Sequence, residues 1–131
     1  MGALYLDTSV LGRVLLGEPG HEAIVAELDR HTEWVSSRLL AVELRRLALR
    51  EGRLLQSSQL LAALALVPID ETILGAAESI EPPSVATLDA IHLVTALRLL
   101  AAEEVEAMMT FDRRLAEGAR EHGLRLVAPS A

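Results

Sequence analysis

Apolar and polar positions along the chain predict short strands that alternate with helices. Short apolar runs predict strands at residues 3–7, 33–37, 67–70, 106–112 and 124–129. Helical spacing of apolar residues predicts helices at residues 8–18, 20–31, 38–52, 54–66, 71–80, about 88–102 and 113–123. The strands lack two-residue alternation, which is typical of a parallel sheet covered on both faces. We therefore predict a single domain over residues 1–131, a three-layer α/β/α sandwich with a central, mostly parallel sheet.

The stretch VATLDAIHLVTALRLLAA, residues 85–102, predicts a buried helix that nevertheless begins with an ionisable acid. From Ala90 onward it consists almost entirely of alanine, leucine and valine, whereas Asp89 lies in its first turn. His92 follows three residues later on the same face of the helix. An acid–base role is one interpretation of His92, and an orienting or core hydrogen bond is the other.

Aspartates gather at the predicted junctions between strands and helices. Four of the five aspartates occupy such places, namely Asp7, Asp70, Asp89 and Asp112. Aspartate is a favoured N-cap residue, so helix capping explains any one of these positions by itself, and we interpret Asp70 as a cap. In open α/β sheets, however, ligands bind beyond the carboxyl ends of the strands, which is where these residues are predicted to lie.

Glu43 requires a different explanation because it lies inside the predicted helix 38–52 and cannot cap it. Leu40 and Leu47 place it beside the apolar face of that helix. A salt bridge to Arg46, three residues later, is the structural alternative. Exposed pairs of this kind contribute only about 0.3–0.5 kcal/mol.

Asp7, Glu43, Asp89 and Asp112 are together expected to converge above the sheet. Four carboxylates at one place repel each other, and burying them unpaired is costly. A divalent cation resolves that repulsion, and oxygen ligands without a His/Cys cluster favour Mg²⁺ or Mn²⁺ over zinc. Such a site activates water and stabilises the charge that develops in a phosphoryl displacement.

The composition narrows the classes of function. The chain has 131 residues, of which 51% are hydrophobic and 24% charged, and no cysteine, so a disulfide or thiolate site is excluded. The formal net charge is -7, and all twelve basic residues are arginines. The basic footprint usual in a nucleic-acid binder is missing, and a bound metal would supply positive charge for a phosphate. Without a signal peptide or an apolar run long enough to span a membrane, we expect a cytoplasmic protein.

Four segments, in order, carry a resemblance to a known family: YLDTSVL, AVELRRL, TLDAIHLVTAL and MTFDRRLAEGAREHGLRLV. Together they resemble PIN-domain ribonucleases, and among these the VapC-type toxins of type II toxin–antitoxin modules. The resemblance implies a PIN-like fold and a Mg²⁺-dependent endoribonuclease that cleaves cellular RNA. It also implies a small antitoxin as partner and a homodimer.

The resemblance also assigns roles to residues. Asp7, Glu43, Asp89 and Asp112 correspond to the acidic catalytic quartet. Asp7, Asp89 and Asp112 correspond to metal ligands, whereas Glu43 would act through water or position the nucleophile. The hydroxyls of two further residues would support the acids, namely Ser9 and Thr110.

Two other functions remain as alternatives. A PIN-like domain without catalysis would bind RNA or protein and use its acids only as helix caps. A phosphotransfer domain also places acids at strand ends, but such domains rely on a lysine near the phosphoryl group, and this chain has no lysine. Metal-dependent cleavage of RNA distinguishes the nuclease from both.

Overall fold

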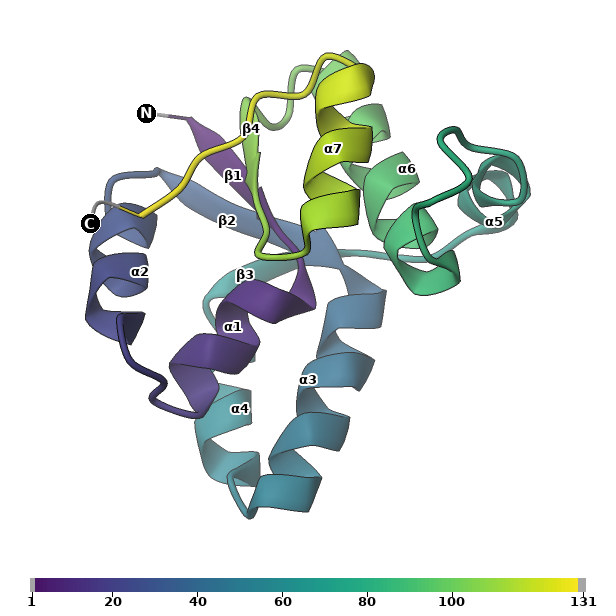
Figure 1. Cartoon of the computed structure of the whole chain (residues 1–131). Coiled ribbons are helices and arrows are strands. Elements are labelled where there is room, and N and C mark those ends of the chain that lie inside the picture. The colour runs from purple at the N-terminus through teal and green to yellow at the C-terminus, as the bar shows by residue number, and fades with distance from the viewer. Residues whose placement is uncertain (1, 130–131) are drawn as a thin grey trace.

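A four-stranded parallel sheet forms the centre of the computed structural model, which describes residues 2–129. Its strands are β1 (Ala3–Leu6), β2 (Glu33–Ser37), β3 (Leu64–Val67) and β4 (Ala107–Met109), in the spatial order β3-β2-β1-β4 (Figure 1). Tyr5 of the central strand β1 pairs with Val35 on one side and Met108 on the other. The predicted parallel sheet is therefore confirmed.

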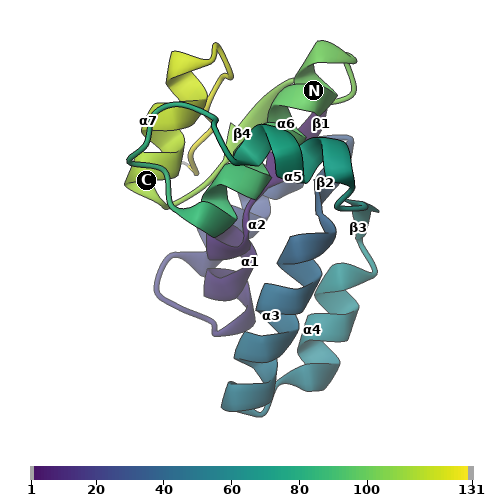
Figure 2. The ribbon, with the colours of Figure 1, turned by 90° about the vertical axis from the view of Figure 1, so that its right-hand side faces the viewer.

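Helices cover both faces of this sheet. They are α1 (Thr8–Leu15), α2 (His21–Leu28), α3 (Arg38–Glu51), α4 (Leu54–Leu61), α5 (Glu71–Ala77), α6 (Thr87–Ala101) and α7 (Arg113–Glu121). Leu4 and Leu6 of β1 enter a core formed with α1, α2, α3 and α4. Tyr5, between them, enters a second core formed with α6 and α7. This alternation along one strand produces the predicted three layers, visible in Figures 1 and 2.

The predicted boundaries are wrong around β3. The sequence predicts one helix over residues 54–66 and a strand over 67–70, whereas α4 ends at Leu61 and β3 runs from Leu64 to Val67. The segment ALAL suits either element, and its pairing with β2, from Trp34↔Leu64 to Ser37↔Val67, selects the strand. Pro68 follows directly and has no N–H to continue the ladder.

The predicted C-terminal strand, residues 124–129, is reduced to an isolated bridge between Met108 and Leu126. Two backbone hydrogen bonds hold this bridge, from Met108 N–H to Arg125 and from Val127 N–H to Met108. The chain then leaves the sheet after a contact too short to count as a strand. No helix among the described residues is long and apolar enough to cross a membrane.

Candidate active site

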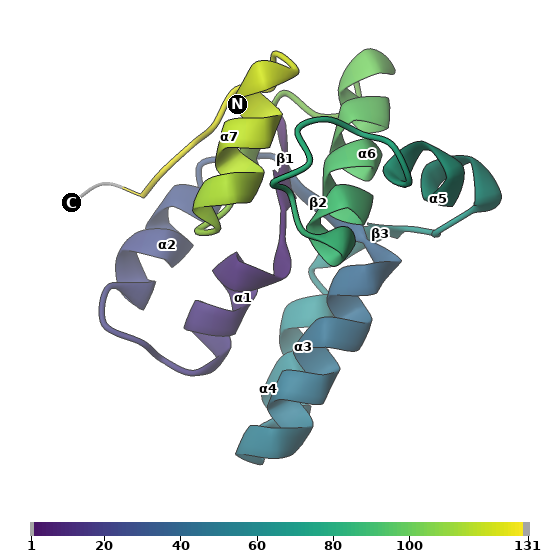
Figure 3. The ribbon, with the colours of Figure 1, turned by 45° about the vertical axis from the view of Figure 1, so that its right-hand side comes forward.

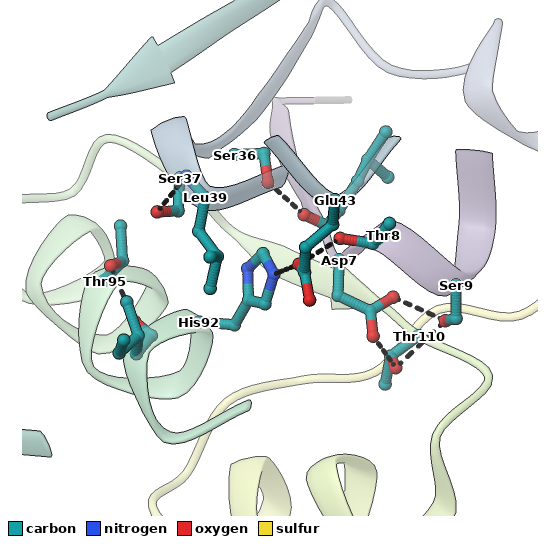
Figure 4. A network of polar contacts seen from close by, with 12 residues as sticks. Asp7, Thr8, Ser9, Ser36, Ser37, Leu39, Glu43, His92, Thr95 and Thr110 are labelled. Carbon is teal, nitrogen blue, oxygen red and sulfur yellow. Dashed lines mark hydrogen bonds and ion pairs between the residues drawn. The ribbon is translucent and has the colours of Figure 1, made fainter. Parts of the chain in front are cut away.

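The first strand ends at a buried carboxylate, Asp7. It occupies the N-cap position of α1, yet its side chain accepts no capping hydrogen bond. Ser9 Oγ donates to one carboxylate oxygen at 2.6 Å, and Thr110 Oγ1 donates to the other at 2.8 Å (Figure 4). The capping interpretation is therefore wrong for Asp7, and the predicted support from the two hydroxyls is confirmed.

The same two hydroxyls join the β1–α1 junction to the loop that follows β4. The backbone N–H of Phe111 donates to Ser9 Oγ at 2.9 Å, and that of Asp112 donates to Thr110 Oγ1 at 3.0 Å. Each hydroxyl thus accepts from one loop and donates to Asp7. This arrangement fixes Asp7 relative to the loop that carries Asp112.

Asp112 and Asp70 both cap helices through their side chains. Asp112 accepts from the N–H of Leu115 at 2.9 Å at the start of α7. Asp70 accepts from the N–H of Ile73 at 2.8 Å at the start of α5 and pairs with Arg98 at 3.2 Å, so its predicted role as a cap is confirmed. Asp112 uses one carboxylate oxygen in this way, and its carboxylate also lies beside that of Asp89.

Asp89 is not a cap, because the N-cap of α6 is Ala86 and Asp89 lies inside the first turn. Burial raises its pKa, and the neighbouring carboxylates of Asp112 and Asp7 raise it further, to about 7. Burial also raises the pKa of Asp7, against the lowering effect of its two hydroxyl donors. Three of the four predicted acids therefore lie within electrostatic reach of one another.

Glu43, the fourth predicted acid, extends from α3 and is held by two donors. Thr8 Oγ1 donates to Glu43 Oε1, and His92 Nε2 lies 3.1 Å from the same oxygen. Half-burial alone would raise the pKa of Glu43, but the hydrogen bonds from His92 and Thr8 outweigh it and lower the pKa below its ordinary value. Within residues 2–129 no ion pair joins Glu43 to Arg46, so that alternative is wrong.

His92 is buried and uses both ring nitrogens. Its Nδ1 lies 2.8 Å from the hydroxyl of Tyr5, which is fully buried and whose pKa is raised by that burial. An ionised Glu43 only accepts, so Nε2 carries the proton that it donates, and in a neutral ring Nδ1 accepts from Tyr5. His92 is therefore placed to orient Glu43 through this hydrogen bond.

Three features near the site were not predicted from the sequence: the contacts of Tyr5, the contact of Thr8, and the stacking of Arg13 on Phe111. The Arg13 guanidinium carbon lies 4.2 Å from the centre of the Phe111 ring, beside the loop after β4. Thr8 stands in the quoted motif YLDTSVL and could have been noticed there. Tyr5 resembles any aromatic residue in a buried strand, so no local signal reveals its contact with His92.

The site offers oxygen ligands only, which suits a hard cation such as Mg²⁺. In the described part of the chain no three Asp, Glu or His side chains form a ready-made metal-binding group. Mg²⁺ usually keeps several waters and binds through one or two carboxylates, so the donor set still fits a hydrated ion. Asp7, Asp89 and Asp112 are the residues that could hold it.

The chain is similar to known proteins over almost its whole length. The family model described as PIN domain matches residues 4–121. Among curated proteins of Mycobacterium tuberculosis, the chain is 35% identical to Ribonuclease VapC47, with 98% of both chains covered. It is 34% identical to Ribonuclease VapC46, over 99% of this chain and 100% of that one, and 36% identical to Ribonuclease VapC35, over 96% of each. The chain belongs to the PIN-domain family and, within it, to the VapC-type ribonucleases.

Proposed function

We propose that this ribonuclease is a Mg²⁺-dependent endonuclease, with Mn²⁺ as an alternative ion, and the toxin of a type II toxin–antitoxin pair. One observation carries the catalytic part of the proposal. Asp7, Asp89 and Asp112 come from three separate parts of the chain, and burial together with the neighbouring carboxylates of Asp112 and Asp7 raises the pKa of Asp89 to about 7. A chain that keeps such repelling groups together gains stability when a cation binds them.

Asp7, Asp89 and Asp112 would hold the ion. When bound, it would lower the pKa of a coordinated water and stabilise charge on the phosphate. Ser9 and Thr110 leave Asp7 little freedom to rotate, because each of its carboxylate oxygens already accepts one hydrogen bond. Asp112 is held in the same manner by the N–H of Leu115, so two of the three ligands are oriented before the ion binds.

Glu43 would position the attacking water and accept its proton. Its lowered pKa keeps the carboxylate ionised at neutral pH, as an acceptor must be. His92 and Thr8 both bind Oε1, which leaves Oε2 without a partner among the described hydrogen bonds. Figure 4 shows Glu43 between His92 and Thr8, with Asp7 beside Thr8.

The proposal also includes partners. The relatives' names, Ribonuclease VapC47 and Ribonuclease VapC46, support RNA as the substrate. The proposal has two further partners. One is a small cognate antitoxin that blocks the acids, and the other is a second copy of this chain in a homodimer. Copurification of the chain with a coexpressed neighbouring open reading frame would test the antitoxin.

Cleavage of RNA by the purified chain tests the catalytic proposal. We expect cleavage in Mg²⁺ and none in EDTA. Asp7→Asn or Asp89→Asn should lower the cleavage rate by more than about 100-fold, because removing a metal ligand should cost more than the 10- to 100-fold lost when a residue that supports a ligand is changed. Asp29→Asn is the matched control, since Asp29 is exposed at the end of α2. Cleavage that is indifferent to metal, or equal in all three variants, would refute the proposal.

A further inference from the structure

The proposed reaction brings a polyanion to a cluster of acids on a chain whose net charge is -7. A metal ion offsets this charge only where it binds, so the flanking phosphates of an RNA strand need cationic side chains nearby. The question is which of the twelve arginines are free to provide them.

Eight of the twelve arginines fall into two groups. Three of them pair with carboxylates, as Arg30 does with Glu27 at 3.6 Å, Arg98 with Asp70 at 3.2 Å and Arg125 with Glu106 at 3.8 Å. Residues 38–53 hold five arginines against two glutamates, and none of the five is within 4.0 Å of a carboxylate in the described part of the chain. The helix α3 is thus a basic element in an acidic protein.

Two of these arginines lie on the same side of α3 as Glu43. Arg46 and Arg50 follow it by three and seven residues, and such positions share one face of a helix. At 1.5 Å per residue they lie about 4.5 and 10.5 Å further along the axis. Both are exposed. Together they form a strip, hereafter the Arg46/Arg50 strip, that begins at the candidate active site and runs away from the sheet.

The packing of α3 leaves this strip open to solvent. Thr8 of α1 contacts Glu43, and Leu47 lies against Gly12 of α1, where an added Cβ would come within 3.4 Å of its side chain. The two helices therefore run side by side, as Figure 3 shows, and α1 covers the Leu47 flank. Arg46 and Arg50 lie on the other flank. Arg45 and Arg53 are engaged elsewhere, with Ser58 and with the carbonyl of Leu15.

An ordinary solvated helix face would mix charges of both signs. Arg46 and Arg50 instead form a like-charge pair four residues apart, which costs about 0.2–0.5 kcal/mol in an isolated helix. Val42 and Leu49 are exposed on the same helix, at 51% and 55%, and would suit a protein surface. The strip begins at Glu43, however, and its charge complements phosphate, which favours the RNA strand.

We propose that the Arg46/Arg50 strip binds the phosphates of the RNA strand next to the scissile bond and leads that strand into the site. This inference rests on the proposed ribonuclease function. It assigns to these residues the positioning of substrate and no part in the chemical step.

Binding of a labelled single-stranded RNA oligonucleotide of mixed sequence tests this surface, measured by fluorescence anisotropy in the Asp89→Asn background to prevent cleavage. Arg46→Gln and Arg50→Gln should each reduce the slope of log K against log salt by about 0.7, and the double variant by about 1.4. If affinities converge at 1 M salt, the slope change in the double variant corresponds to roughly 65-fold weaker binding at 50 mM. Arg46→Lys should keep most of the slope, because it keeps the charge.

Arg120→Gln is the matched control, since Arg120 is an exposed arginine in the last turn of α7. It should leave the slope unchanged, and thermal unfolding of all variants should coincide. An unchanged slope in the double variant would overturn the proposal and leave the strip to a protein partner. If the chain with Asp89 intact failed to cleave RNA while the slope still fell, the proposed nuclease activity would fail and the RNA surface would stand.

Discussion

The junctions β1–α1 and β3–α5 resemble each other in sequence and differ in what their aspartates do. Each strand is followed by an aspartate at the N-cap of the next helix. Asp70 is exposed and caps α5 with its side chain, and the N–H of Ile73, followed by Arg98, lowers its pKa. Asp7 is 3% exposed, caps nothing through its side chain, and burial raises its pKa. The same local pattern thus serves a helix in one place and a candidate active site in the other.

Burial and distant neighbours thus distinguish the candidate active-site acid from the acid that caps a helix. Asp70 finds its main partner three residues away, as caps do. Asp7 finds Thr110, which is 103 residues away, and has Asp89 and Asp112 as electrostatic neighbours. Asp7 gains the partner Thr110 because β1 and β4, which are distant in sequence, pair with each other and end side by side.

Of the changes that test the difference between the two junctions, Ser9→Ala should have the largest effect on activity. This change removes one donor to Asp7 and the acceptor of the Phe111 N–H, so we expect cleavage or apparent Mg²⁺ affinity to fall about 10- to 100-fold. Titration of the cleavage rate with Mg²⁺ measures it.

The matched change at the other junction is Asp70→Ala. Loss of that cap should lower the midpoint of urea unfolding and leave the cleavage rate unchanged. If Ser9→Ala cleaved as the wild type does, or Asp70→Ala lost activity while folded, the two junctions would not differ in the way described.

His92→Gln should have a smaller effect and lower kcat about 10-fold. The reason is that acid–base catalysis accelerates a reaction about 10²- to 10⁴-fold, and positioning of the general base contributes part of this gain. Loss of a well-placed donor should also raise the pKa of Glu43, so the acidic limb of the rate profile should move to higher pH. A pH series of single-turnover rates measures both.

Thr95→Val provides the control for that prediction. Thr95 is buried on the same helix and donates to the carbonyl of Ile91, and it reaches the His92–Glu43 pair only through Tyr5, so its loss should move the pH profile less than His92→Gln does. An unchanged acidic limb in His92→Gln would mean that His92 is only a core residue.

The smallest effect concerns stability without metal. The pKa of Asp89 is about 7 in the folded chain and about 3.8 when unfolded, so the unfolded state releases its proton first and stability falls as pH rises from about 4 to 7. Solvent screening of this half-buried group limits the loss to about 1 kcal/mol, or ~4 °C in Tm. Thermal unfolding in EDTA between pH 5 and 8 measures it.

Mg²⁺ should reduce this decrease in Tm with rising pH, and Asp89→Asn should make Tm nearly independent of pH over the same range. Asp70 behaves in the opposite way: its lowered pKa adds stability above the ordinary pKa of the group, which is lost as pH falls through the lower value. A Tm in EDTA that rose between pH 5 and 7 would contradict the assignment of Asp89 to a cluster of repelling carboxylates.

Much of the fold could be predicted from the sequence, because the pattern of apolar residues that marks each strand and each helix is a local property of the chain. The predictions failed where one segment suited two elements. Residues 64–67 could continue α4 or form a strand, and pairing with β2 decided between them. Residues 124–129 had strand-like composition but found only one bridge, at Leu126.

For the site, the sequence was enough to identify candidate residues, because acids and hydroxyls follow the predicted strands. It could not say which aspartates cap helices, because a cap and a metal ligand look alike within three residues. The folded chain shows that the Asp70 side chain caps α5 and that the Asp7 side chain caps no helix. It also shows that Glu43 contacts His92 and not Arg46. Those outcomes depend on burial and on charges far apart in the chain, which exist only once the sheet has brought its carboxyl ends together.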